Sequence, residues 1–172
     1  MREDPETTPP PPVGERRHRC GPARVMVRHT GQHPALPAPP RPLRVIVVDD
    51  EPAVAQAVRD TVEDLGHTVC GIAHTEEEAL LLAGRERPDI ALMDVRLGIG
   101  GDGIAAARRL NAGFGVRSIF LSGYADHTTM SRITETYPLG VVHKPFSTAQ
   151  LKSALDLARS RLRLARAVAV VA

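Results

Sequence analysis

A short apolar run between Pro88 and a glycine-rich stretch is the sequence feature that most restricts how this chain can fold. Residues 89–94 read Asp-Ile-Ala-Leu-Met-Asp, with a carboxylate at each end. A strand without polar alternation is typical of the middle of a parallel sheet, where helices cover both faces. Asp94 would then stand at the carboxyl end of the strand, the edge at which open α/β sheets bind ligands. The alternative is a helix cap or turn residue, the commoner role of an Asp beside glycines.

Strand-like and helix-like segments alternate on both sides of this run. Continuous apolar or β-branched residues predict further strands at residues 44–48, 68–73, 116–121 and 141–142. Apolar residues at helical spacing predict a helix after each strand, at about residues 52–65, 76–84, 104–110, 126–135 and 147–165. Two of these helices begin with capping boxes, formed by Thr75 with Glu78 and by Ser147 with Gln150. Regular alternation of this kind predicts an α/β fold, a three-layer doubly wound sandwich around a five-stranded parallel sheet.

The first 42 residues have a different composition from the rest. They hold eleven of the fifteen prolines and seven Arg against four acidic residues, so their net charge is +3 and residues 43–172 carry −1 of the total of +2. We expect a disordered or polyproline-like arm at residues 1–42, a globular domain at 43–166 and a short apolar tail at 167–172. The arm either offers a proline motif to a partner or has no role. A third alternative is that translation begins later, for example at Met26.

Composition also argues against several classes of function. A globular part with a charge of −1 and an aromatic content of 3% does not suit a nucleic-acid binder. The arginines of the last helix fit a solvated helix face, and no helix-turn-helix follows them. No secretory signal is present, the apolar tail is far shorter than the roughly 20 residues of a membrane span, and the two cysteines, Cys20 and Cys70, suit a reducing compartment. We expect a cytoplasmic protein without nucleic-acid or membrane partners.

Polar side chains follow four of the predicted strands at the point where each ends: Asp49 and Asp50, Asp94, Ser122 and Lys144. In a doubly wound sheet these ends lie along one edge, so the side chains converge. Carboxylates about 4 Å apart repel each other by about 4 kcal/mol per pair at an effective dielectric constant near 20, which calls for a cation. Because the donors are all oxygens, a hard ion such as Mg²⁺ is favoured.

Lys144 is one of only two lysines in a chain with twenty arginines. A lysine at this strand end is therefore harder to attribute to chance than an arginine would be. The set predicts a phosphoryl site in which Asp94 is the nucleophile. The metal and Lys144 would spread the charge of the transferring group, and Ser122 would bond one of its oxygens.

Four short motifs follow one another along the chain. Residues 47–52 read Val-Val-Asp-Asp-Glu-Pro, and Arg96 and Leu97 follow the Asp94 strand. Further on, residues 122–126 read Ser-Gly-Tyr-Ala-Asp and residues 144–146 read Lys-Pro-Phe. In this order, over about residues 43–165, these motifs resemble the receiver domain of bacterial two-component response regulators. The resemblance implies a flavodoxin-like (β/α)5 fold with strand order 2-1-3-4-5. It also implies that Asp94 accepts a phosphoryl group from a sensor histidine kinase or a histidine phosphotransfer protein.

The same resemblance assigns roles to the other site residues. Asp50 would bind Mg²⁺ directly, together with Asp94 and the backbone carbonyl of Arg96, and Asp49 would act mainly through a bound water. Ser122 would be the switch hydroxyl and Lys144 the phosphate-binding lysine.

The sequence departs from the family pattern at Val141, where receivers often carry an aromatic switch residue. Rotation of a large ring therefore cannot carry the signal, unless Tyr137 or Tyr124 substitutes for it. Arg96 and Tyr124 occupy the positions two past the phosphoacceptor and two past the switch hydroxyl, which tune phosphoryl lifetime in the family. Both are bulky and would hinder an attacking water, so we expect slow self-dephosphorylation.

We therefore interpret the chain as a stand-alone receiver: a phosphoacceptor that assists its own phosphorylation and dephosphorylation but is otherwise not an enzyme. Phosphorylation would change binding on the face formed by the last two helices and the last strand, and a homodimer through that face is one candidate complex. One alternative is a scaffold of the same fold that works without phosphorylation. Another is a small Rossmann-like enzyme, because residues 98–103 match G-x-G-x-x-G. Since that motif opens the third βα unit and lies close to Asp94, we expect a flexible glycine loop there instead.

Overall fold

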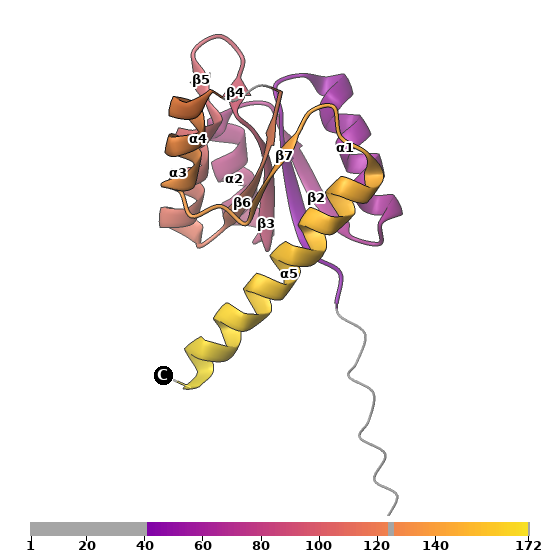
Figure 1. The fold of residues 1–172 in the computed structure, drawn as a ribbon, viewed down its shortest axis with the longest axis vertical. Helices are drawn as coiled ribbons and strands as arrows, with labels where there is room; N and C mark the ends of the chain where they lie inside the picture. Colours follow the sequence, from indigo (N-terminus) through magenta and orange to yellow (C-terminus); the bar gives the residue numbers. More distant parts are fainter. Residues whose placement is uncertain (1–40, 124–125, 172) are drawn as a thin grey trace, which may run out of the picture. The chain divides into compact units, whose positions relative to one another are not determined.

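The computed structural model describes residues 41–123 and 126–171, with side chains described up to residue 168. Most of the proposed arm, including Cys20 and Met26, lies outside the described residues, as does Tyr124. Strands and helices alternate along the described chain (Figure 1). The strands are β1 (Arg44–Val48), β2 (Thr68–Ala73), β3 (Ile90–Asp94), β4 (Arg96–Leu97), β5 (Gly101–Asp102), β6 (Arg117–Ser122) and β7 (Gly140–His143). The helices are α1 (Pro52–Asp64), α2 (Glu76–Glu86), α3 (Gly103–Phe114), α4 (His127–Thr134) and α5 (Thr148–Val171).

Five of the strands form one parallel sheet in the order β2-β1-β3-β6-β7. Without the two short strands β4 and β5, this is the predicted order 2-1-3-4-5, so the predicted doubly wound fold is confirmed. Helices α1 and α5 cover one face of the sheet, and α2, α3 and α4 cover the other (Figure 1). Strand β3 lies in the middle with Ile90, Ala91, Leu92 and Met93 fully buried, which explains why it shows no polar alternation.

The register of the sheet brings the predicted site residues to one edge. Val48 pairs with Met93, Asp94 with Leu121, and Ser122 with His143, so all four strands end at nearly the same level. Residues that follow these ends in sequence therefore come together although up to 95 positions separate them. This alignment is the structural basis of the site.

The helix termini follow the local sequence signals. The amide of Glu78 donates to Thr75 Oγ1 at 3.2 Å, although the Glu78 carboxylate accepts from the amide of His74 and not from Thr75 itself. Ser147 and Gln150 form the complete reciprocal capping box. Helix α5 continues to Val171, beyond the predicted end near residue 165, because the added residues are Arg, Ala and Val, none of which stops a helix.

The glycine-rich run after Asp94 forms a hairpin, where the sequence predicted a flexible loop. Strands β4 and β5 pair antiparallel, with Arg96 opposite Asp102 and Leu97 opposite Gly101. A Cβ on Gly101 would lie 1.7 Å from the carbonyl oxygen of Leu97, and one on Gly103 would lie 1.8 Å from that of Asp94. These glycines thus have a packing reason: they let two backbone segments approach closely beside the site.

Among the helices of the described residues, none is both long enough and apolar enough to span a bilayer.

Candidate functional site

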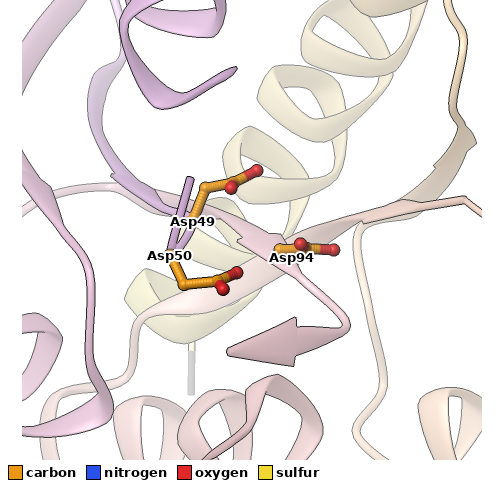
Figure 2. Close-up of side chains that lie close together, drawn as sticks. All are labelled: Asp49, Asp50 and Asp94. Atoms are coloured by element: carbon orange, nitrogen blue, oxygen red, sulfur yellow. The ribbon is translucent and has the colours of Figure 1, made fainter. Parts of the chain in front are cut away.

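Three carboxylates meet at the carboxyl ends of β1 and β3. Asp49 and Asp50 follow β1, and Asp94 is the last residue of β3. Each of the three offers an oxygen within 4.8 Å of the oxygens of the other two. Figure 2 shows the three side chains close together, with their carboxylates pointing to the same side of the view. The structure therefore brings together the acidic residues that the sequence predicted to converge.

The three carboxylates differ in their exposure and in the hydrogen bonds that they accept from protein donors. Asp49 is 1% exposed, and its two oxygens accept from Lys144 Nζ at 2.8 Å and from the amide of Glu51 at 3.0 Å. Asp50 is exposed, and Gly98 of the β4–β5 turn lies over it, since a Cβ there would be 3.7 Å from Asp50 Oδ2. Asp94 is intermediate, with 18% of its side chain exposed. Asp50 and Asp94 thus have oxygens to offer a ligand, and Asp49 is held mainly by protein donors.

Lys144 connects the two sides of this cluster. Its amide donates to the carbonyl of Ser122 at 2.7 Å, which fixes the residue at the end of β7 beside β6. Its Nζ lies 2.8 Å from Asp49 Oδ2 and 3.4 Å from Asp94 Oδ2. Burial alone would lower the pKa of Lys144, but the hydrogen bond to Asp49 and the charge of Asp94 raise it above its usual value. The ammonium therefore stays charged.

The surroundings of Asp94 disfavour its charged form. Burial raises the pKa of Asp94, Lys144 partly offsets that effect, and the like charge of Asp49 adds to it, so the net shift is upward. The negative charge at this position is only partly compensated by protein groups. A carboxylate in this state is expected to bind a cation or an electrophile readily.

Ser122 is fully buried at the end of β6, and its Oγ has no hydrogen-bond partner among the residues that the structure describes. A buried hydroxyl without a partner costs about 1–3 kcal/mol. Because Ser122 lines the same cavity as Asp94 and Lys144, a ligand oxygen bound there would satisfy it. The structure thus places Ser122 in the wall of the cavity that Asp94 and Lys144 also line.

A cavity of about 660 Å³ opens beside Asp94 and Lys144 and extends to α4. Besides the predicted residues Asp94, Ser122, Lys144 and Arg96, its wall includes three side chains that the sequence did not single out: Asp102, Thr129 and Arg132. Asp102 is the N-cap of α3, and its position just before a helical segment is a signal that would have identified it. No comparable signal marks Arg132, which reaches Asp102 across 30 residues of sequence.

The donor set fits a magnesium ion. The cluster consists of carboxylate oxygens, with a backbone carbonyl at Arg96 as the further candidate, and no His or Cys belongs to it. Mg²⁺ prefers such oxygen ligands and commonly retains waters, which two accessible carboxylates beside an open cavity allow. Zinc sites in proteins are usually built with His or Cys ligands, and this carboxylate cluster contains neither.

Comparison with known proteins gives a consistent result. The family model "Response regulator receiver domain" matches residues 45–156. The phyllosphere-induced regulator PhyR of Methylorubrum extorquens is 32% identical over 66% of this chain, and the transcriptional regulatory protein PdtaR of Mycobacterium tuberculosis is 29% identical over 71%. The matches span 42% and 59% of the length of those two relatives. The signal receiver domain of a modulated diguanylate cyclase from Desulfovibrio desulfuricans G20 superposes with a TM-score of 0.67 at 33% identity, over 72% of this chain and 98% of that one.

Proposed function

The chain belongs to the response regulator receiver domain family, and from this premise we propose that Asp94 accepts a phosphoryl group in a magnesium-dependent reaction. The donor would be the phosphohistidine of a sensor histidine kinase or of a histidine phosphotransfer protein. The observation that carries the proposal is the position of Asp94, which lies beside two other carboxylates and one ammonium. It also shares a cavity with the buried Ser122 hydroxyl, which has no hydrogen-bond partner within the described part of the chain.

Each residue has a distinct part in the proposed transfer. An oxygen of Asp94 attacks the phosphorus, a new P–O bond forms, and the P–N bond of the donor breaks with its electrons going to the imidazole nitrogen, which is then protonated. Lys144 holds a positive charge within 3.4 Å of Asp94, where the negative charge of the transferring group collects. The Ser122 hydroxyl donates to one phosphoryl oxygen.

Asp50, Asp94 and the backbone carbonyl of Arg96 would hold the magnesium ion, and Asp49 would act through a bound water. Bound there, the ion would neutralise the carboxylates and the phosphoryl oxygens. The occupied oxygens of Asp49 support its indirect role, since Lys144 and the Glu51 amide already bond to them.

Phosphorylation would act by changing which partners bind to the face formed by α4, β7 and α5. A cavity of about 570 Å³ between β7 and α5 supports this choice of surface, and Leu157 on its rim is 48% exposed. A second copy of the chain is one candidate for this face, and a downstream protein is another.

Phosphorylation by a small-molecule donor tests the proposal directly. Wild-type protein incubated with acetyl phosphate and Mg²⁺ should gain the mass of one phosphoryl group on Asp94. The adduct should be absent from Asp94→Asn and from wild type treated with a chelator. If wild type gains no mass while the donor remains intact, the chain functions instead as a scaffold that does not depend on phosphorylation.

Comparing elution volumes with and without beryllofluoride, a phosphoryl mimic, would test the interaction face. Earlier elution in beryllofluoride supports a homodimer, and unchanged elution directs the search to a different partner.

A further inference from the structure

Three cationic side chains line the cavity beside Asp94: Lys144, Arg96 and Arg132. Arg132 of α4 lines this cavity together with Asp94, Ser122 and Lys144. We propose that Arg132 is a phosphoryl ligand, which exchanges its bond to Asp102 for a bond to the phosphoryl group on Asp94. The inference rests on the proposed phosphorylation of Asp94 and adds a residue to it.

The bond that Arg132 would give up is weak enough to exchange. Its Nη2 forms an ion pair with Asp102 Oδ2, and the two side chains are 44% and 37% exposed. Asp102 Oδ1 also accepts from the amides of Ile104 at 2.9 Å and Ala105 at 3.3 Å, because Asp102 caps α3. When Arg132 leaves, Asp102 therefore keeps its capping bonds, and water can reach the freed oxygen. Exposed ion pairs of this kind contribute about 0–1 kcal/mol.

Lys144 cannot move in the same way. It bonds to Asp49, which is 1% exposed, so its departure would leave a buried carboxylate without its counter-charge. Lys144 is thus held by a buried partner, whereas Arg132 is held by an exposed one and is free to exchange. A guanidinium also suits the task, because its planar fork of donors matches the oxygens of a phosphoryl group in pairs.

The charge of the site supplies the driving force for the exchange. Three carboxylates and one ammonium give the cluster a net charge of −2, which the two positive charges of a bound Mg²⁺ would offset both before and after phosphoryl transfer. Phosphorylation converts the single charge of Asp94 into a group carrying about −1.5 to −2, with three strong acceptor oxygens. The attraction for Arg132 therefore rises at Asp94 and stays constant at Asp102.

The exchange would also couple phosphorylation to α4. Arg132 precedes Ile133, the residue of α4 that is buried in the core. A movement of Arg132 would therefore act on the helix next to its buried contact. Strand β7 carries Val141 where many receivers have a large switch residue, so α4 needs another connection to the site. Arg132 provides that connection within one side chain.

Two substitutions on the same ion pair separate this idea from a purely structural role. Arg132→Gln removes the proposed ligand, and we expect it to weaken beryllofluoride binding, measured by calorimetry in Mg²⁺, by about three- to tenfold. Asp102→Asn keeps a good N-cap but frees Arg132, and we expect it to strengthen binding by about twofold. Loss of a structural ion pair would instead shift the affinity in the same direction in both variants.

The chain offers a matched control. Arg108 of α3 and Glu135, the C-cap residue of α4, form another ion pair, at 2.6 Å, and neither lines the cavity. Glu135→Gln should leave beryllofluoride affinity unchanged. Equal affinity of Arg132→Gln and wild type, or a shift in the same direction for both variants of the pair, overturns the role of Arg132 alone. If wild type itself binds no beryllofluoride and gains no phosphoryl group, the proposed function falls as well.

Discussion

Strand β3 carries a carboxylate at each end, and the two have opposite surroundings. Asp89, just before the strand, is 6% exposed at its side chain and accepts hydrogen bonds from Arg41 at 2.7 and 3.2 Å, from the Arg44 amide at 2.9 Å and from Arg166 at 2.7 Å. Asp94, at the far end, has Lys144 at 3.4 Å and two other carboxylates beside it.

The two pKa values reflect this difference. Burial would raise the pKa of Asp89, but the Arg44 amide and the guanidinium groups of Arg41 and Arg166 outweigh it, so the net shift is downward. At Asp94 burial prevails over Lys144, and the net shift is upward. One strand therefore ends in a carboxylate whose charge the fold satisfies and in another whose charge it leaves partly unsatisfied. The first position suits stability, and the second suits reaction with a ligand.

Removing the cation next to Asp94 should have the largest effect, because Lys144 is the positive group that lies closest to two of the clustered carboxylates. Lys144→Gln leaves three carboxylates without the ammonium that holds two of them. We expect phosphorylation by acetyl phosphate to slow by about 100-fold, comparable to the loss of one preorganised charge-stabilising donor in other active sites. Intact-mass time courses would measure the rate. Lys152→Gln, which breaks an exposed pair on α5, is the control and should not change it.

Removing the satisfied carboxylate should instead affect stability. Asp89→Ala leaves the Arg44 amide and two guanidinium groups without their shared acceptor, and we expect the free energy of unfolding to fall by about 2 kcal/mol. Urea titration followed by circular dichroism would measure the change. A phosphorylation rate equal to that of wild type in the folded variant would confirm that the two ends of β3 have separate roles. A stability loss below a few tenths of a kcal/mol would contradict the role assigned to Asp89.

The pH dependence of stability should separate the two ends further. The folded-state pKa of Asp89 is depressed, so its contribution is fully present above the ordinary carboxyl pKa of about 4 and is lost as pH falls through the folded pKa. Asp89→Asn should therefore destabilise the protein at pH 7 and make stability less dependent on pH in the acid range. Urea titrations at several pH values would measure both effects. An unchanged acid dependence would show that other carboxylates account for it.

Neutralising the unsatisfied carboxylate should have a smaller effect of opposite sign. Asp94→Asn removes one of three neighbouring negative charges at the cost of part of the Lys144 interaction. We expect a gain in stability of about 0.5–1 kcal/mol in the absence of divalent ions, because the group that is removed was desolvated and repelled. The same urea titrations in a chelator would show it. A loss of stability as large as that of Asp89→Ala would mean that the two carboxylates are equivalent.

The surroundings of Asp94 were easier to predict from the sequence than those of Asp89. Asp49, Asp50, Asp94, Ser122 and Lys144 each follow a predicted strand, and parallel strands in register bring such positions together by geometry alone. The side-chain partners of Asp89, Arg41 and Arg166, lie 48 and 77 positions away near the two ends of the described chain, where no periodic pattern fixes which side chains meet.

Near the site, the sequence failed to predict the hairpin of β4 and β5 for a different reason. A run of glycines is typical of a flexible loop, and only the close approach to the backbone of Leu97 and Asp94 shows why glycine is required. The sequence did not indicate Arg132, because its position in the site depends on a contact with Asp102, the N-cap of another helix and distant in sequence.

The smallest expected effect concerns how long the phosphoryl group survives on Asp94. Arg96 stands on β4 two residues after Asp94 and lines the cavity, with an exposed side chain that can obstruct water on its way to the phosphorus. Arg96→Ala should therefore accelerate self-dephosphorylation by about two- to fivefold, less than one factor of ten and hence under about 1.4 kcal/mol. The decay of the adduct by intact mass after removal of the donor gives the rate. Arg96→Met, which keeps the bulk and removes the charge, should decay as slowly as wild type if obstruction is the cause. Rapid decay of both variants would show that the charge of Arg96 matters. Slow decay of both would show that other residues of the cavity keep water away from the phosphorus.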